Sequence, residues 1–225
     1  MLLAVDTSTQ YMGICLYKES QVVGEMTWRT NRHHTVELAP SIDTLFNRCG
    51  AAVRELTALA VATGPGSFTS LRIGLSHLKG MALALHLPMV GIPTLDILAV
   101  AQPPNEVPLV ACLQAGRKRI AYQVYEWSHR KGWQTEMEPH LATADEFASL
   151  FPEKVIICGE LSKEQREQIR KLDQFSLTSP ALSLRRPAFL AELAWRRFTK
   201  KDIDDPATLA PIYLHIAKKP SAEGN

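Results

Sequence analysis

Cysteine is scarce in this chain, and its spacing excludes the usual cysteine-based sites. The four cysteines are Cys15, Cys49, Cys112 and Cys158, and no CxxC pair occurs. A zinc ribbon or a thioredoxin-like redox motif needs such pairs, so neither is supported. Each cysteine lies alone in an apolar run, which is typical of buried free thiols in a reducing compartment.

Histidine also lacks the spacing of a metal site. The seven histidines form no HExxH and no HxxxH pattern. His33 and His34 are adjacent, and adjacent residues on a helix or strand point in different directions. An autonomous metalloprotease-like protein therefore lacks its ligands. We expect no metal and no tightly bound cofactor.

The chain has neither a large excess of one charge nor a long apolar run. Lys and Arg total 25 and Asp and Glu 23, which does not suggest a protein that grips a nucleic-acid backbone by itself. Short basic clusters such as Arg185-Arg186 are interpreted as solvated faces. The apolar run at residues 2–5 is too short for a signal peptide, and no stretch approaches the length of a membrane span. We expect a cytoplasmic protein without membrane contact.

The sequence contains one order of strands and helices, and this order occurs twice. Apolar runs and turn residues predict strands at 2–5, 13–17 and 22–28, a helix near 36–49, a strand at 59–62, a helix at 67–86, a strand at 89–92 and a helix at 94–101. After a proline-rich break at 103–108 the same order returns. A duplicated α/β protein is expected, with the actin, Hsp70 and sugar-kinase (ASKHA) architecture. Its lobes would be residues 1–102 and 103–225, with the option that the final segment packs back on the first lobe.

The turn after the first strand is a candidate nucleotide site. In this architecture that turn meets nucleotide phosphates, and here it reads Asp6-Thr7-Ser8-Thr9. Hydroxyl and backbone N–H groups bind oxygens, and Asp6 would position a metal ion or a water. The alternative is that Asp6, Thr7 and Ser8 only cap a turn.

A glycine-rich turn precedes the predicted helix at 67–86. Residues 64–74 read GPGSFTSLRIG, and a helix N-terminus after such a turn would suggest an anion site. The spacing is neither GxxxxGK[ST] nor GxGxxG. Gly66 and Gly74 can instead serve close packing of one backbone on another.

This run resembles the TsaB (YeaZ-like) family and its catalytic paralogue TsaD. Residues 79–84 and 90–93 share the resemblance, and residues 3–8, 34–40 and 211–214 are similar to TsaB. The match is dense over residues 1 to about 100 and thin afterwards. The resemblance implies a non-catalytic subunit needed to put threonylcarbamoyl on the adenosine beside the anticodon of tRNAs reading A-starting codons. Such a subunit acts by binding and activating a TsaD-type partner.

Two departures from related enzymes bear on catalysis. TsaD holds its metal with an HxxxH pair, and the matching positions here are Thr94 and Leu98, which cannot replace imidazole. Active ATPases and kinases of this architecture present a second carboxylate where this chain has Gln114, which cannot act as a base. No catalytic residue is predicted. The rival hypothesis is an autonomous ATPase or small-molecule kinase that uses Asp6.

The helices at 36–49 and 67–86 are predicted to form a docking surface. The regular stripe of the second helix is assigned to the core: Phe68, Leu71, Leu75, Leu78, Ala82 and Leu85. Apolar residues off that stripe are the interface candidates: Leu38, Leu45, Ile73, Gly74 and Met81. The alternative is a core helix that the protein itself covers on both sides, and the family resemblance favours the docking surface. The resemblance implies a TsaD-like subunit and a TsaE-like ATPase as partners, and a homodimer when the chain is alone. It also allows a nucleotide at the partner boundary and gives tRNA contact only an indirect or weak role.

Overall fold

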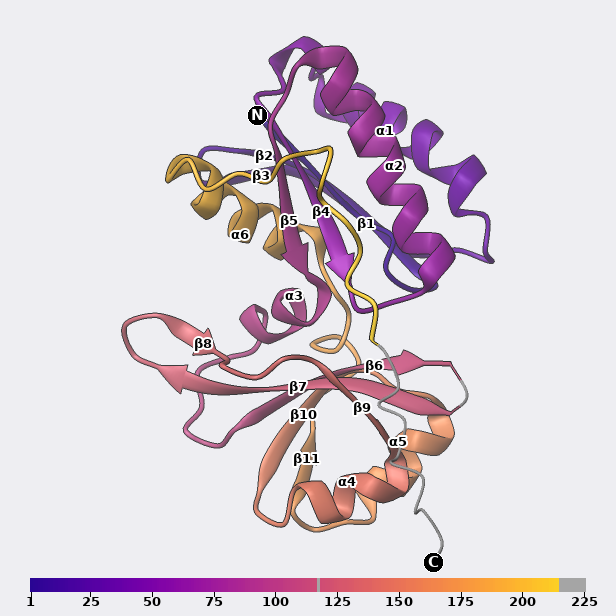
Figure 1. Cartoon of the computed structure of the whole chain (residues 1–225), viewed down its shortest axis with the longest axis vertical. Helices are drawn as coiled ribbons and strands as arrows, with labels where there is room; N and C mark the ends of the chain where they lie inside the picture. Colours follow the sequence, from indigo (N-terminus) through magenta and orange to yellow (C-terminus); the bar gives the residue numbers. More distant parts are fainter. Residues whose placement is uncertain (117, 215–225) are drawn as a thin grey trace, which may run out of the picture.

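Two mixed sheets, drawn one above the other in Figure 1, carry the two halves of the chain. The computed structural model describes residues 1–116 and 118–214. The first half comprises β1 (Leu2–Asp6), β2 (Tyr11–Lys18), β3 (Gln21–Arg29), α1 (His34–Cys49), a 3-10 turn (Val53–Glu55), β4 (Ala58–Gly64), α2 (Phe68–Leu85), β5 (Met89–Pro93) and α3 (Thr94–Val100). The second half comprises β6 (Leu109–Ala115), β7 (Arg119–Ser128), β8 (Gly132–Gln134), β9 (His140–Thr143), α4 (Ala144–Leu150), β10 (Val155–Glu160), α5 (Lys163–Arg170), β11 (Phe175–Leu177) and α6 (Pro187–Thr199). The expected order is confirmed, with the third strand of the second half divided into β8 and β9.

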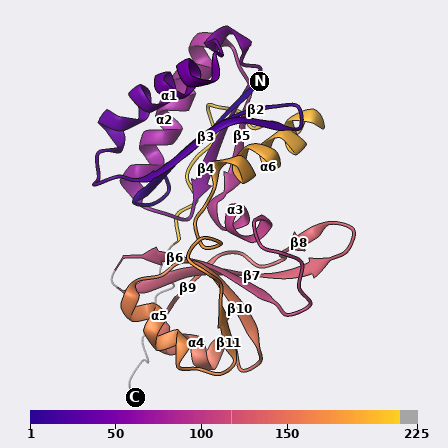
Figure 2. The same ribbon diagram turned by 180° about the vertical axis from the view of Figure 1, so that it is seen from behind.

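The first sheet has helices on both faces. Its strand order is β3-β2-β1-β4-β5, and β1, β4 and β5 run parallel to one another. Leu3 and Val5 of β1 point into the core under α1 and α2, whereas Leu2 and Ala4 point into the core under α6. This alternation explains why β1 is apolar at every position before Asp6. Seen from behind in Figure 2, α1 and α2 lie on one side of the sheet and α6 on the other.

The second sheet has the order β11-β10-β6-β7-β8, and β9 also pairs with β7. On one face, α4 and α5 pack on it through the fully buried Phe147 and Ile169. Both helices begin with the capping boxes that their sequences predict, Thr143 with Glu146 and Ser162 with Gln165. The helices therefore start where the sequence indicates.

The last helix of each half packs on the sheet of the other half. In α3, Leu95 lies in one core with Leu109 of the second sheet, while Leu190 of α6 lies in the core of the first sheet. After α6 the chain continues along the first sheet, where the Asp204 N–H donates to the Met89 carbonyl at 2.9 Å. The boundary expected between 102 and 103 thus separates the strands of the two sheets but not the helices that cover them. This exchange ties the two lobes together (Figure 1).

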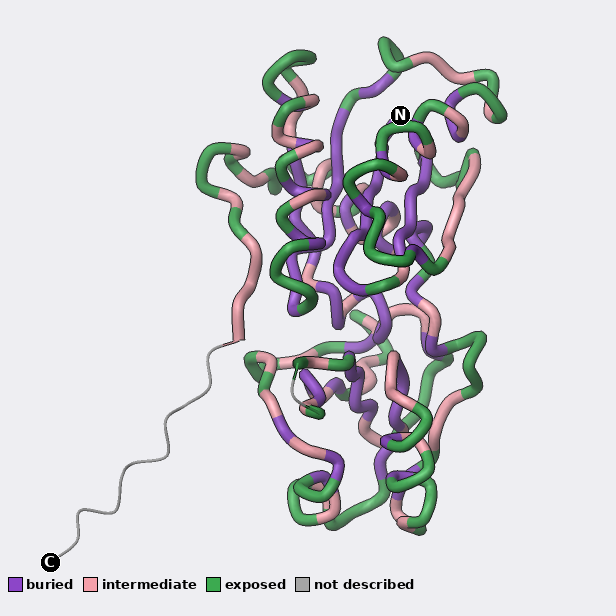
Figure 3. Tube along the Cα trace, turned by 90° about the vertical axis from the view of Figure 1, so that its right-hand side faces the viewer, coloured by how far each residue is buried: buried purple, intermediate pink, exposed green. Residues whose placement is uncertain are grey.

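The distribution of buried and exposed residues follows this two-lobed arrangement. In Figure 3 the buried backbone runs through the interior of each lobe, and exposed backbone lies on the outer turns and helices. Within residues 1–116 and 118–214, no helix is both long enough and apolar enough to cross a bilayer.

Candidate functional site

A cleft of about 900 Å³ opens between the two lobes. Thr9 and Gly66 of the first lobe line it, as do Gln114 and Arg119 of the second. The C-terminal segment adds Tyr213. Because Thr9 follows β1 and Gln114 lies near the end of β6, this is the region where the ASKHA architecture places a nucleotide.

The carboxylate of Asp6 lies beside this cleft and already has partners. Its Oδ1 accepts a hydrogen bond from the backbone N–H of Ser8 at 2.8 Å. Its Oδ2 accepts one from Nε of Arg185 at 2.7 Å. The Asp6 side chain is only 5% exposed. It can therefore hold a metal ion or a water only if Arg185 moves away.

Arg185 joins the two lobes through buried polar contacts. Its guanidinium also donates to the Glu160 carboxylate at the end of β10 and, at 3.0 Å, to Oγ1 of Thr9. Burial lowers the pKa of Arg185, but Asp6 and Glu160 raise it by more, so its pKa lies above the ordinary value and the side chain stays charged. A cation of the protein therefore occupies the place beside Asp6 where a bound metal ion would be needed.

The prediction that Arg185-Arg186 is a solvated face is wrong for Arg185. Arg186 is exposed and pairs with Glu25, whereas the Arg185 side chain is 1% exposed. Sequence reasoning missed the role of Arg185 because its acidic partners lie 179 and 25 residues away. No local spacing indicates a contact over such separations.

Thr7 and Ser8 use their hydroxyls inside the protein. Thr7 Oγ1 donates to the carbonyl of Ser70 at 2.6 Å. The Ser8 hydroxyl shares a hydrogen bond of 2.9 Å with that of Thr94, which accepts another from the Gly64 N–H at 3.0 Å. The Asp6 carboxylate thus caps the turn through the Ser8 N–H, whereas the Thr7 and Ser8 hydroxyls bind the turn to α2 and to Thr94.

The glycine-rich turn packs directly on the Asp6 turn. A Cβ on Gly66 would lie 2.3 Å from the Ser8 carbonyl oxygen, and one on Gly74 would lie 2.4 Å from Oγ1 of Thr7. Close packing of backbone on backbone is therefore confirmed for Gly66, whereas Gly74 packs against the side chain of Thr7. The same contact corrects the placement of Gly74, which is buried inside the lobe and does not lie on an exposed docking surface.

The side chains that stand where related enzymes have metal ligands or a second carboxylate cannot bind a metal tightly or act as a base. Thr94 and Leu98 are fully buried, and the described part of the chain holds no group of three or more His, Cys, Asp or Glu that could bind a metal. Gln114 presents only an amide to the cleft. Glu160, a carboxylate that does line the cleft, is bonded to Arg185.

The residues proposed for docking are mostly in the core, which corrects their placement. Leu38 and Leu45 of α1 are 1% and 2% exposed and pack in the core between the helices and the first sheet. The reason is that α1 turns its most apolar face to the sheet. Ile73 and Met81 are half-buried against the same core.

The assigned core stripe of α2 is right at its centre and wrong at its ends. Leu71, Leu75, Leu78 and Ala82 are buried, whereas Phe68 and Leu85 are exposed. Val36 and Leu83 are exposed on these two helices as well. We call the α1–α2 face the set formed by the exposed apolar residues, the half-buried Ile73 and the exposed Gly80: Val36, Phe68, Ile73, Gly80 and Leu83. A groove of about 560 Å³ lies at its Phe68 and Ile73, and His77 also lines it.

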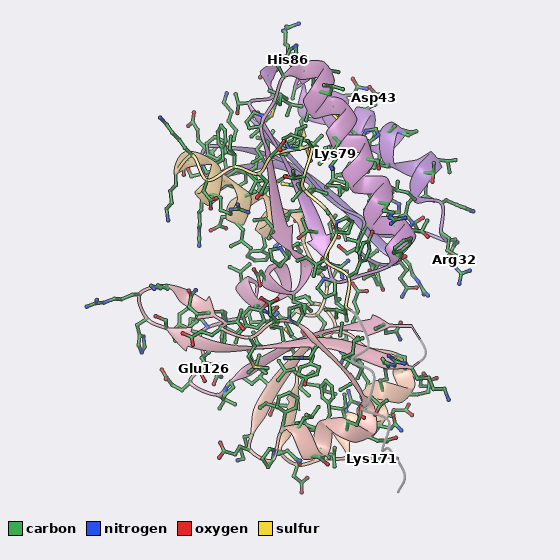
Figure 4. All side chains as sticks on the ribbon, in the orientation of Figure 1. Arg32, Asp43, Lys79, His86, Glu126 and Lys171 are labelled. Carbon is green, nitrogen blue, oxygen red and sulfur yellow. The ribbon has the colours of Figure 1, made fainter. Side chains whose placement is uncertain are left out.

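Figure 4 labels two charged residues of this region, Asp43 on α1 and Lys79 on α2. Gly80 beside Lys79 faces free space, because a Cβ there would meet nothing within 4 Å. Burial lowers the pKa of His77 in the groove, so this side chain is neutral near pH 7. The groove nevertheless carries the positive charge of Arg72, which also lines it.

The C-terminal segment lies between the cleft and the α1–α2 face. The Ile212 N–H donates to the Thr63 carbonyl at 2.7 Å. Arg72 of α2 donates to the Tyr213 hydroxyl at 2.8 Å and stacks 3.6 Å from the ring centre of Phe68. These contacts hold the segment against the first turn of α2.

Comparison with known sequences gives matches along most of the chain. The model of the TsaD family, tRNA N6-adenosine threonylcarbamoyltransferase, matches residues 22–195. The tRNA threonylcarbamoyladenosine biosynthesis protein TsaB of Bacillus subtilis (strain 168) is 29% identical over 223 residues, covering 96% of this chain and 95% of that protein. The protein of the same name from Escherichia coli (strain K12) is 35% identical over 98 residues, 44% of this chain and 42% of that one.

The fold has a solved counterpart. YeaZ from Pseudomonas aeruginosa superposes with a TM-score of 0.77 at 21% sequence identity, over 95% of this chain and 99% of the other. That likeness shows the shared two-lobed fold. Together with the family match over residues 22–195, it leads to one conclusion: the chain belongs to the TsaB (YeaZ) family of tRNA threonylcarbamoyladenosine biosynthesis proteins, which is paralogous to TsaD.

Proposed function

We propose that this chain is a non-catalytic subunit that binds and activates a TsaD-type transferase. The partner would transfer threonylcarbamoyl to the adenosine beside the anticodon of tRNAs reading A-starting codons. A TsaE-like ATPase would be the further component, and the cytoplasm the place of action. One observation carries the proposal: Asp6, the acid that an ASKHA enzyme would use, is bonded to Arg185.

The rival hypothesis, an autonomous ATPase or kinase, needs a free carboxylate in the cleft. Phosphoryl transfer depends on metal ions held by acids and on a group that orients the nucleophile. Here Asp6 and Glu160 both bond to Arg185, and the second-lobe position is Gln114. Taking Arg185 out would leave two buried carboxylates unpaired, a change that costs about 3–5 kcal/mol when a buried pair is broken. The ion pair therefore argues against catalysis that needs Asp6.

The α1–α2 face is the proposed docking surface. Leu83 is 79% exposed and Val36 68%, and Phe68 is also exposed. Large apolar side chains gathered on one face are typical of protein–protein contacts. Gly80 in the exposed part of α2 costs roughly 1 kcal/mol of helix stability relative to Ala. Since no neighbour among residues 1–116 and 118–214 needs the space at Gly80, a partner helix that approaches closely would explain it.

This chain activates the partner if the α1–α2 face binds the partner's active conformation more tightly than its inactive one. A protein shifts a conformational equilibrium only by its differential affinity for the two states. Without the partner, the same exposed face would pair with a second copy of the chain. A nucleotide at the partner boundary would meet Arg32 and Arg119, which lie at the cleft.

A reconstituted reaction tests the proposal. Purified chain alone should hydrolyse no ATP and transfer nothing to tRNA, while its addition to a TsaD-type subunit should start threonylcarbamoyl transfer. The variant Leu83→Asp should stay folded and fail to activate. ATP turnover by the chain alone that disappears in Asp6→Asn would overturn the proposal in favour of the rival.

A further inference from the structure

A second pocket lies away from the interlobe cleft, where α3, the β7–β8 hairpin and α6 meet. Its volume is about 670 Å³, within the range of small-molecule sites. Figures 1 and 2 both place α3 between α6 and the hairpin. Neither the docking surface nor the Asp6 turn uses this pocket.

One wall of the pocket is the indole ring of Trp127. Trp127 as a residue is partly exposed, and the ring of Trp133 packs edge-on against its ring with 5.4 Å between ring centres and 70° between planes. Trp133 is itself fixed, because its Nε1 donates to the Gln102 carbonyl at 3.1 Å. An aromatic ring held in place and partly open is a platform on which a nucleic-acid base can stack.

Asp96 of α3 adds a carboxylate acceptor to the pocket. The Tyr125 hydroxyl donates to its Oδ1 at 2.6 Å and so fixes the orientation of the carboxylate. Among the contacts of the described residues, no hydrogen bond or ion pair engages Oδ2 of Asp96. An ionised carboxylate accepts through both oxygens and can take two N–H donors side by side.

The rim of the pocket carries cations. Arg130 and Lys131 sit at the turn of the hairpin and are exposed, and Arg196 of α6 completes the rim while pairing with Glu192. Exposed basic side chains of this kind bind phosphate.

Two acids near the hairpin, Glu126 in β7 and Glu106 in the segment before β6, do not line the pocket. Glu126, labelled in Figure 4, lies between Tyr125 and Trp127 in β7. Its side chain therefore points to the opposite face of the strand. Glu106 lies 3.4 Å from a ring nitrogen of His129. The pocket thus combines a positive rim with one carboxylate and an aromatic wall.

We infer that this pocket binds a guanine nucleotide, with the base stacked on Trp127, its N1–H and N2–H groups donating to Asp96, and the phosphate beside Arg130 and Lys131. Of the four RNA bases, guanine presents two adjacent N–H donors on one edge. Adenine and cytosine present one amino group beside an acceptor nitrogen, and uracil presents one N–H between two carbonyls. The nucleotide could be free or an unpaired guanosine in RNA, and the chemistry of recognition is the same.

Calorimetric titration of the full chain tests this assignment. GMP should bind about tenfold or more tightly than AMP, since a bidentate contact discriminates bases by that order. Asp96→Asn should remove the preference for GMP, and Trp127→Leu should weaken GMP binding by a similar factor. Asp43→Asn on α1 is the matched control and should bind like the wild type. Asp96→Asn keeps an acceptor for Tyr125, and its fold is checked by circular dichroism.

Two RNA pentamers separate the sources of the nucleotide. Binding of r(UUGUU) but not r(UUAUU), with weak binding of GMP, would identify RNA as the source. Tight binding of free GMP with no advantage for the pentamer would identify a free nucleotide. If neither GMP nor r(UUGUU) binds, or if Asp96→Asn leaves discrimination unchanged, the assignment is wrong.

Discussion

Nε of Arg185 lies 2.7 Å from Oδ2 of Asp6, and both side chains are buried where the two lobes meet. Asp6 ends the first strand of the chain, and Arg185 lies just before the last helix. The guanidinium also reaches Glu160 of the second sheet. One arginine thus neutralises the acid at the end of β1 and connects the two halves of the fold.

Removing this cation should be costly. Arg185→Met leaves Asp6 and Glu160 buried without their partner, so we expect the free energy of unfolding to fall by about 3–5 kcal/mol. Arg186→Met breaks the exposed pair with Glu25 and a cation–π contact with Phe189, and it should cost about 1 kcal/mol or less. Urea denaturation of both variants measures the difference. Equal, small losses would mean that the buried contacts contribute little.

Two glycines of α2 should respond in opposite ways to alanine. Gly80→Ala enters free space in a helix interior and should stabilise the chain by about 0.5–1 kcal/mol. Gly74→Ala forces a methyl group against Thr7 and should destabilise it by about 1–3 kcal/mol. Thermal unfolding decides both signs. If Gly80→Ala destabilised the isolated chain, the claim that no internal contact needs this glycine would fail.

Aspartate substitutions on α2 should separate docking from folding. Leu83→Asp lies on the exposed side, so the chain should stay folded but lose self-association and capture of a TsaD-type partner. Leu78→Asp places a charge in the core and should unfold the chain. Met81 is half-buried against the core, so Met81→Asp should partly destabilise the chain as well. Normal partner capture by folded Leu83→Asp would remove the α1–α2 face from consideration.

Ionised Asp96 in the second pocket should lower the free energy of unfolding at neutral pH. Burial raises the pKa of Asp96, an effect that the hydrogen bond from Tyr125 only partly offsets. Arg130, Lys131 and Arg196 line the same pocket but are not among the causes of this pKa shift. A carboxyl group with a raised pKa in the folded state stabilises the fold below its unfolded pKa and loses that contribution as the pH rises through the folded pKa. Asp96→Asn should therefore be more stable than the wild type at pH 7.

The advantage of Asp96→Asn should shrink as the pH is lowered toward the ordinary aspartate value of 3.8. Paired thermal melts across this range measure it. A constant difference at all pH values would show that the ionisation of Asp96 is not the cause.

Much of the fold could be predicted because its information is local. Runs such as Leu2–Val5 indicate strands covered on both faces, and the capping boxes at Thr143 and Ser162 mark where helices begin. What could not be predicted is which sheet each terminal helix covers. The apolar residues of α3 and α6 fit either sheet, and only the three-dimensional path of the chain decides.

In the candidate site, too, features with a local sequence signal could be predicted and long-range contacts could not. The Asp6 turn and the close packing at Gly66 could be predicted from residue type, because an acid after a strand indicates a turn and a glycine permits a close approach. The partner that Gly66 approaches, Ser8, could not be predicted this way. The function of Arg185 could not, since its partners are remote in the sequence. The docking residues were misplaced because Leu38 and Leu45 were judged by chemical type without knowing which side of α1 faces the sheet.

The most direct test of the account is mass spectrometry of tRNA nucleosides from cells depleted of this protein. Depletion should remove threonylcarbamoyladenosine from tRNAs reading A-starting codons. Asp6→Asn keeps the size of the side chain, so it should restore the modified nucleoside if the chain is not catalytic, whereas Leu83→Asp should not restore it. Full restoration by Leu83→Asp together with none by a stably folded Asp6→Asn would contradict the account and assign catalysis to this chain.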